Sequence, residues 1–82
     1  MAKYERRFSG DFYSALSALH DGILNGSASA TYEDGSDCTA GDVRCAVRVY
    51  ERYSLVGGNR VSLSVLLLET AHGARLSAIA SG

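Results

Sequence analysis

The chain has 82 residues, so we expect a single domain, 1–82, with room for one sheet and one or two helices. Eight basic and nine acidic residues give a formal net charge of −1, which excludes a strong overall attraction to nucleic acid or anionic lipid. The longest apolar run, Val65–Leu68, is far shorter than the ~20 residues that cross a membrane, and the N-terminus lacks the apolar segment of a secretory signal. We therefore expect a cytoplasmic protein without a membrane segment.

The first part of the chain predicts a strand followed by an amphipathic helix. Lys3–Phe8 alternates in the manner of a strand, and Ser9 has the side chain of a helix N-cap. A helix over about residues 10 to 25 then places four apolar residues on one stripe: Phe12, Leu16, Leu19 and Ile23. The pair Asn25-Gly26 is typical of a helix end, because both residues tolerate a left-handed backbone.

The rest of the chain predicts strands joined by turns. The expected strands are Ser27–Glu33, Asp42–Ser54, Arg60–Glu69 and Arg75–Ser81. The expected connections are a turn at Asp34–Asp37, a loop at Gly57-Gly58-Asn59 and a turn at Thr70–Gly73. The fold class is therefore α+β, with one amphipathic helix packed on an antiparallel sheet of about five strands in the order β-α-β-β-β-β.

The run DVRCAVRVYERYS, Asp42–Ser54, has two different faces when it is extended. One face is mostly aliphatic and is expected to point into the core: Val43, Cys45, Val47, Val49 and Tyr53. The other face is expected to point away from the helix: Arg44, Ala46, Arg48, Tyr50 and Arg52. A helix would also group the three arginines, but the β-branched and aromatic residues favour a strand.

Pairing with the next strand favours a three-residue loop, because that register sets Tyr53 opposite Leu63 and Val49 opposite Leu67. On the outer face the same register places arginines and Tyr50 beside aliphatic residues. One helix covers only one side of a sheet, so we expect this second side to be an interface between copies of the chain, most simply in a homodimer. The expected interface residues are Leu66, Leu68 and Ile79.

The expected ligand- or partner-binding residues on this face are Arg44, Arg48, Tyr50 and Arg52. Guanidinium groups could bind a carboxylate or phosphate of a small anionic ligand, or they could pair with neighbouring acids on a solvated face. Single-stranded RNA is a weaker alternative, because this face carries only one aromatic ring for base stacking.

The sequence predicts no catalytic residues, no cofactor and no metal site. The two cysteines are seven residues apart, which is not a metal-ligand spacing, and neither His20 nor His72 has a recognisable acid or nucleophile partner. An enzyme whose site forms only in an oligomer stays open as an alternative.

The segments GSASATYEDGSD, GDVRCAVRVYERYS and GGNRVSL resemble a small family of uncharacterised bacterial proteins, a domain of unknown function found mostly in Gram-positive gut bacteria. The resemblance runs from Lys3 to Gly82 and is most distinctive from Gly26 to Leu63. It implies no activity and no site residues. It does imply that this chain is a C-terminally short member, lacking a strand and a helix that other members carry.

Overall fold

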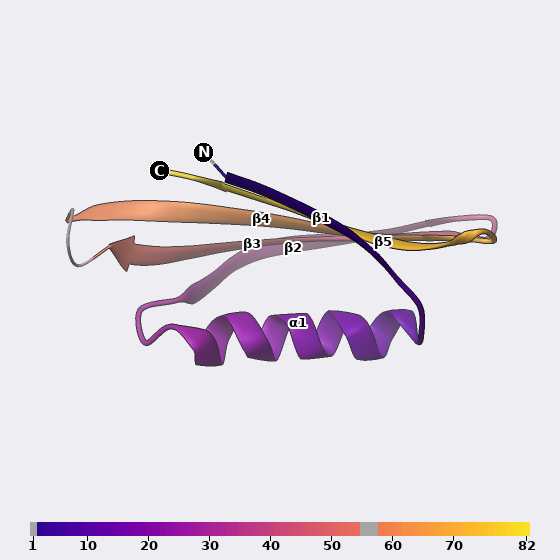
Figure 1. Ribbon diagram of the computed structural model, residues 1–82, viewed down its shortest axis with the longest axis horizontal. Helices are drawn as coiled ribbons and strands as arrows, with labels where there is room; N and C mark the ends of the chain where they lie inside the picture. The colour runs from indigo at the N-terminus through magenta and orange to yellow at the C-terminus, as the bar shows by residue number, and fades with distance from the viewer. Residues whose placement is uncertain (1, 55–57) are drawn as a thin grey trace.

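A computed structural model describes residues 2–54 and 58–82. It contains one helix and five strands: β1 (Ala2–Phe8), α1 (Phe12–Gly26), β2 (Thr31–Ala40), β3 (Val43–Ser54), β4 (Asn59–Thr70) and β5 (Gly73–Ser81). The strands form one sheet in the order β1-β5-β4-β3-β2, in which every neighbouring pair is antiparallel. The helix lies against one side of the sheet (Figure 1). The predicted fold class and element order are therefore confirmed.

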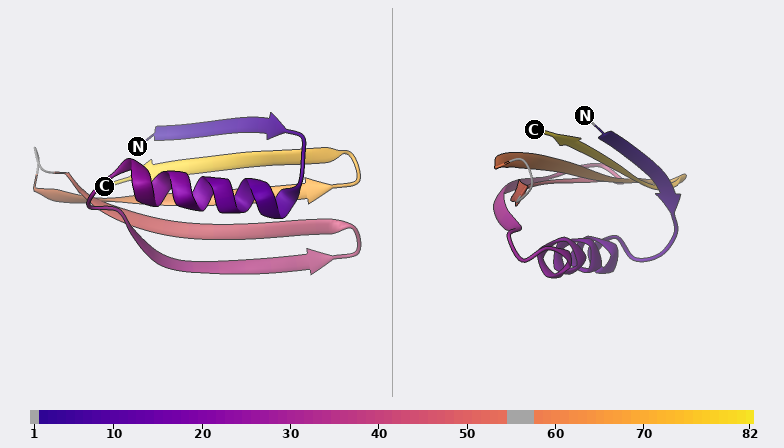
Figure 2. Two further views of the ribbon diagram at one scale, coloured as in Figure 1. Left: turned by 90° about the horizontal axis from the view of Figure 1, so that it is seen from below. Right: turned by 60° about the vertical axis from the view of Figure 1, so that its left-hand side comes forward.

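The first strand, β1, lies at one edge of the sheet beside the last strand, β5, and the chain leaves β1 to form α1. β2, β3, β4 and β5 follow as successive hairpins, and the helix runs below them (Figure 2). The sheet has the twist that is usual for antiparallel strands. As a result, the N-terminal end of β1 and the C-terminal end of β5 rise away from the helix (Figure 1).

The helix begins at a different residue from the one predicted. Asp11, not Ser9, is the N-cap: its Oδ2 accepts a hydrogen bond from the Ser14 backbone N at 2.8 Å. This bond lowers the pKa of the Asp11 carboxyl. The predicted stripe does face the sheet, since Phe12 and Leu16 are buried and Leu19 and Ile23 pack against the same core.

The predicted turn at Asp34–Asp37 is wrong. β2 continues through it as far as Ala40, with an irregularity in the pairing between Tyr32 and Asp34, and the chain turns instead at Gly41 and Asp42. Local composition favoured a turn there because Asp, Gly and Ser are common turn residues. Tertiary contacts override that preference, as described below for Gly35.

The predicted core face of β3 is also wrong. The helix covers the face that carries the arginines, so Ala46 and Tyr50 are each 1 % exposed, together with Val65 and Leu67 of β4 at 2 %. Arginine side chains can lie along an apolar surface while their charged ends reach its margin, and this arrangement leaves Ala46 and Tyr50 to form the core. The aliphatic alternation of β3 therefore points away from the helix.

The predicted register between β3 and β4 is wrong by an odd number of residues, so the opposite face of β3 lies beside Leu63 and Leu67. These two residues of β4 are on the helix side of the sheet, as expected. Tyr53 pairs with Arg60 and Val49 with Ser64, whereas Leu66 lies opposite Val47 and Leu68 opposite Cys45. Part of the predicted loop, Gly57, lies outside the described residues.

The adjacent residues Leu66 and Leu67 test which face of β4 is the core. We expect Leu67→Ala to lower the free energy of unfolding by about 2–5 kcal/mol, because it removes a buried side chain. Leu66→Ala is expected to cost about 1 kcal/mol or less in the monomer, because its side chain is already partly exposed. Urea unfolding at protein concentrations where the chain is monomeric measures both values. An equal or larger cost for Leu66→Ala would contradict the face assignment.

Candidate functional site

A polar and aromatic cluster joins the helix to β2 and β3. His20 Nδ1 and the Tyr50 hydroxyl oxygen are 2.8 Å apart and form a hydrogen bond between the helix and strand β3. The ring of Tyr32 lies edge-on to the His20 ring and close to that of Tyr50, with centroid separations of 5.3 and 5.7 Å. Because burial disfavours the phenolate, the pKa of Tyr50 is raised above its ordinary value.

Arg48 extends from the same face of β3 to the edge strand β2. Its Nη1 donates to Asp37 Oδ1 at 2.6 Å and to its neighbour's backbone oxygen, Val47 O, at 2.9 Å. The hydrogen bond lowers the pKa of Asp37 and raises that of Arg48. A Cβ on Gly35 would lie 2.9 Å from Arg48 Cδ and 2.5 Å from the Tyr32 hydroxyl oxygen. Any other residue at position 35 would therefore have to displace the Tyr32 or Arg48 side chain.

The four predicted ligand-binding residues lie on one sheet face but have different surroundings. Tyr50 is buried, and its ring therefore has no free side on which a base could stack while the helix is in place. Arg48 holds Asp37, and Arg44 lies 3.8 Å from Glu69 and over the ring of Tyr13. Among the described residues, Arg52 has no carboxylate within 4 Å.

The opposite side of the sheet has no covering layer among the described elements (Figures 1 and 2). Side chains alternate between faces along each strand, so the neighbours of the buried residues in β3, β4 and β5 point to this side. We call this side the open face. Its aliphatic and cysteine residues in β3, β4 and β5 are Val43, Cys45, Val47, Val49, Leu66, Leu68 and Ile79. The three predicted interface residues are thus on the uncovered side, together with the aliphatic side of β3 that was expected in the core.

Both cysteines lie on the open face. Cys38 of β2 and Cys45 of β3 are direct partners in the strand register, and both are free thiols. Sequence spacing could not show this proximity, because the turn between the two strands was predicted at the wrong position.

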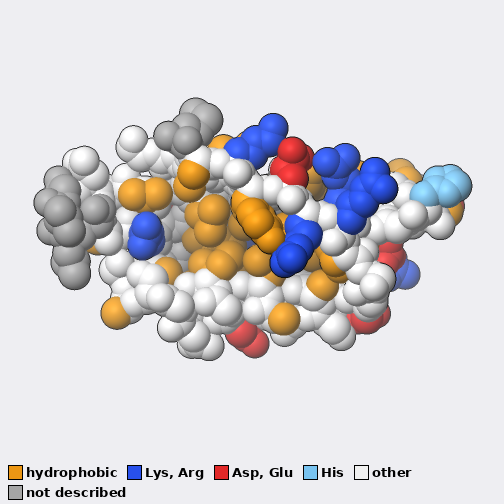
Figure 3. Space-filling view, viewed as in Figure 1, with side chains coloured by type: hydrophobic (Ala, Val, Ile, Leu, Met, Phe, Trp, Pro, Cys, Tyr) orange, Lys and Arg blue, Asp and Glu red, His pale blue; other side chains and the backbone are white. Residues whose placement is uncertain are grey.

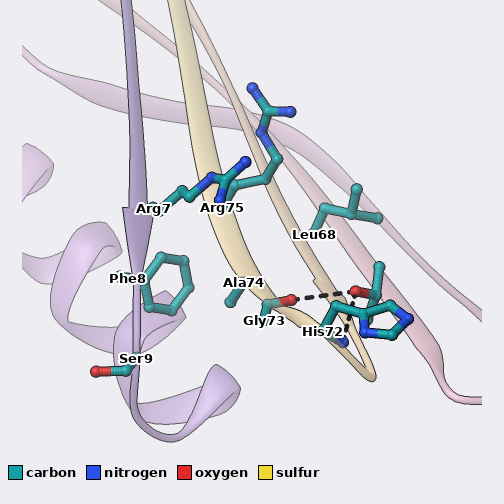
Figure 4. Close-up of a pocket in the computed structure, with 9 residues that line it drawn as sticks. Arg7, Phe8, Ser9, Leu68, His72, Gly73, Ala74 and Arg75 are labelled. Carbon is teal, nitrogen blue, oxygen red and sulfur yellow. Dashed lines mark hydrogen bonds between the residues drawn. The ribbon is translucent and has the colours of Figure 1, made fainter.

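A hollow of about 400 Å³ lies where the β4–β5 turn meets the end of β1. Figure 4 shows Arg7 and Arg75 side by side on adjacent strands, with His72 at the turn. The two arginines are direct register partners, and like charges in that position disfavour the pairing. Glu5 offsets this, since its Oε2 lies 3.3 Å from Arg75 Nη2. Arg7 was missed from sequence because the pairing of the first and last strands leaves no local signal.

These features define an α+β domain with a single helix on one face of a five-stranded antiparallel sheet. The chain belongs to a family of unknown function (DUF6054), which matches residues 1–82. The resemblance to an uncharacterised family is therefore confirmed, whereas the bacterial origin stays a prediction. No curated protein and no solved structure matches the chain.

Two further findings concern the described part of the chain. None of its helices has the length and apolarity needed to cross a membrane. Nor do the described residues bring together three or more metal-ligating side chains of His, Cys, Asp or Glu.

Two glycine substitutions test the crowding at β2. Gly35→Ala is expected to lower the free energy of unfolding by about 1–3 kcal/mol, because the added methyl group displaces Arg48 or Tyr32. Gly22→Ala in the helix is the matched control, since a Cβ there meets nothing within 4 Å. It is expected to raise stability by up to about 1 kcal/mol. Chemical unfolding of both variants makes the comparison, and a stabilising Gly35→Ala would contradict the packing described.

Burial of the Tyr50 hydroxyl predicts a loss of stability in alkali. The folded-state pKa is raised, so the neutral phenol contributes stability that is complete below the ordinary pKa of 10.0 and is lost as the pH rises through the folded value. Tyr50→Phe should therefore lose less stability than the wild type between neutral pH and pH values above 10.0. Tyr53→Phe, at a half-exposed position, should follow the wild type. Thermal unfolding across this pH range gives the comparison, and identical profiles for all three proteins would refute the assignment.

Proposed function

We propose that this is a non-catalytic domain that self-associates, with the open face of one copy packed on the open face of another. The observation that carries the proposal is the apolar content of a sheet side that no described element covers. Monomeric proteins rarely expose a large contiguous apolar patch, and such patches commonly mark interaction sites. Face-to-face packing of two sheets about 10 Å apart would bury the patch in the manner of a β-sandwich.

The size of the sheet fits a stable dimer. The sheet is seen nearly edge-on in Figure 1, so the principal extents of 43 and 19 Å bound its face at about 820 Å². A standard protein interface buries about 800 Å² on each partner. Because about 820 Å² is an upper limit, a homodimer of standard size would use nearly the whole of one sheet face.

The edges of the sheet are less suited to association than its face. The outer strand β1 carries Lys3, Glu5, Arg6 and Arg7, and the outer strand β2 carries acidic residues and an irregularity in its pairing. Charges and bulges on edge strands oppose the addition of another strand. The edge strand β1 is mainly basic, and the edge strand β2 is acidic. A two-fold axis parallel to the strands would place β1 of one copy over β2 of the other, so that opposite charges would lie close together.

A second candidate is binding of a small anion by the arginine-bearing face, and it is proposed for Arg52. The observation that favours Arg52 is that its charge has no carboxylate partner among the described residues, whereas Arg44 and Arg48 have one. We also propose that the protein is located in the cytoplasm.

Self-association is tested by light scattering over a range of protein concentrations, with a reductant present so that Cys38 and Cys45 cannot cross-link copies. The wild type should be a dimer. Leu66→Glu should shift it to monomer, because a carboxylate would be buried at the centre of the interface. Ala18→Glu, at an exposed position of the helix, should leave the dimer intact. A monomeric wild type, or a dimer unaffected by Leu66→Glu, would overturn the proposal.

A further inference from the structure

The twist of the sheet opens an apolar wedge on the helix side, away from the open face. Its hollow of about 320 Å³ lies between the C-terminal half of α1, the N-terminal end of β4 and the C-terminal end of β5. The apolar side chains that line it are Tyr50, Ile23, Val61, Leu63, Ala30 and Ala80. Small residues contribute to its lining, with Gly22 and Gly26 on the helix and Ala80 on β5.

A second hollow lies nearer the start of α1, on the same side of the sheet. It has a volume of about 240 Å³ and is lined by Arg6, Phe8, Ala15, Leu19, Leu67 and Leu76. Ala15, Leu19 and Ile23 are spaced by four residues, so they form one row along α1 that borders both hollows. Figure 3 shows hydrophobic side chains at the surface between the sheet and the helix, with basic side chains next to them.

The charged residues at this groove that have no ion-pair partner among the described residues are both basic. Arg52 lines the larger hollow and Arg6 the smaller one, and neither has a carboxylate within 4 Å among the described residues. Glu51, which also borders the larger hollow, is engaged by Arg60 at 2.9 Å. An uncompensated guanidinium at the rim of a long apolar groove is complementary to an anion attached to an aliphatic chain.

We propose that this groove binds an anionic amphiphile of the fatty-acid type. Its carboxylate is held by Arg52, and its chain lies over Leu63 and Ile23 and follows the row of helix side chains toward Leu19. The larger hollow has the volume of a small-molecule site, and its lining is mainly apolar with two charged residues, Arg52 and Glu51, of which Glu51 is paired with Arg60. This inference rests on the anion-binding candidate for Arg52 and not on self-association.

The test is calorimetric titration of the purified protein with sodium dodecanoate, below the concentration at which it forms micelles. Saturable binding of one dodecanoate per chain is expected. Arg52→Gln should weaken it roughly tenfold or more, because a charge-assisted hydrogen bond is lost. Arg6→Gln is the matched control at the other end of the groove and should have a smaller effect. A larger loss with Arg6→Gln would overturn the placement of the carboxylate.

Filling the wedge with a larger side chain tests where the aliphatic chain of dodecanoate lies. Ala80→Leu should abolish dodecanoate binding, while circular dichroism and the solution mass stay those of the wild type. If Ala80→Leu changes the fold, blocking the same hollow with Ile23→Phe provides the equivalent measurement from the helix side. Undiminished binding in a folded blocked variant would overturn the proposal.

Three further ligands separate this inference from the anion-binding candidate. Dodecanol, which has the chain without the charge, should bind at least tenfold more weakly than dodecanoate, and acetate and inorganic phosphate should bind to Arg52 more weakly than dodecanoate because they lack the chain. Phosphate binding that depends on Arg52 and equals that of dodecanoate would overturn the amphiphile and leave anion binding standing. No binding of dodecanoate or phosphate would overturn both.

Discussion

The structure depends on which side of the sheet the single helix covers. The side chain of Tyr50 fixes this choice: it is almost fully buried below α1, and its hydroxyl group is hydrogen-bonded to His20. A buried hydroxyl without a partner would be costly, so the helix and the sheet are held in one relative position by a polar contact as well as by apolar packing. The positions of the wedge, of Arg48 and of the open face all follow from this arrangement.

Arg48 shows how a charged residue can belong to a covered face. Its side chain is largely shielded, with 16 % of its surface exposed, yet its guanidinium reaches Asp37 at the edge of the sheet. The glycine at position 35 leaves space for this crossing. An arginine in such a place contributes packing through its stem and specificity through its charged end. In the monomer, Arg48 therefore joins β3 to the edge strand β2.

The two proposed interaction regions lie on opposite sides of one sheet and have different origins. The open face exists because one helix cannot cover both faces of a five-stranded sheet, and its strands carry aliphatic residues on both sides. The wedge exists because the twist of the sheet separates β5 from the end of the helix. A second copy can therefore occupy the open face without competing with an amphiphile in the wedge. This separation allows each region to be altered by substitutions that leave the other unchanged.

Sequence periodicity alone determined the single helix, the strand character of the chain after it, and the α+β class, because these depend on local alternation and on the 3.6-residue period. It also identified Leu66, Leu68 and Ile79 as residues of an uncovered face. It could not determine which face of β3 the helix covers, because both faces contain apolar residues and the choice is made by fit. Ala46 and Tyr50 pack below the helix, while Arg48 reaches Asp37 across Gly35. Only the tertiary structure decided the β3–β4 register, the course of β2 through a turn-like segment, and the closeness of Arg7 to Arg75, because each depends on contacts between residues far apart in the chain.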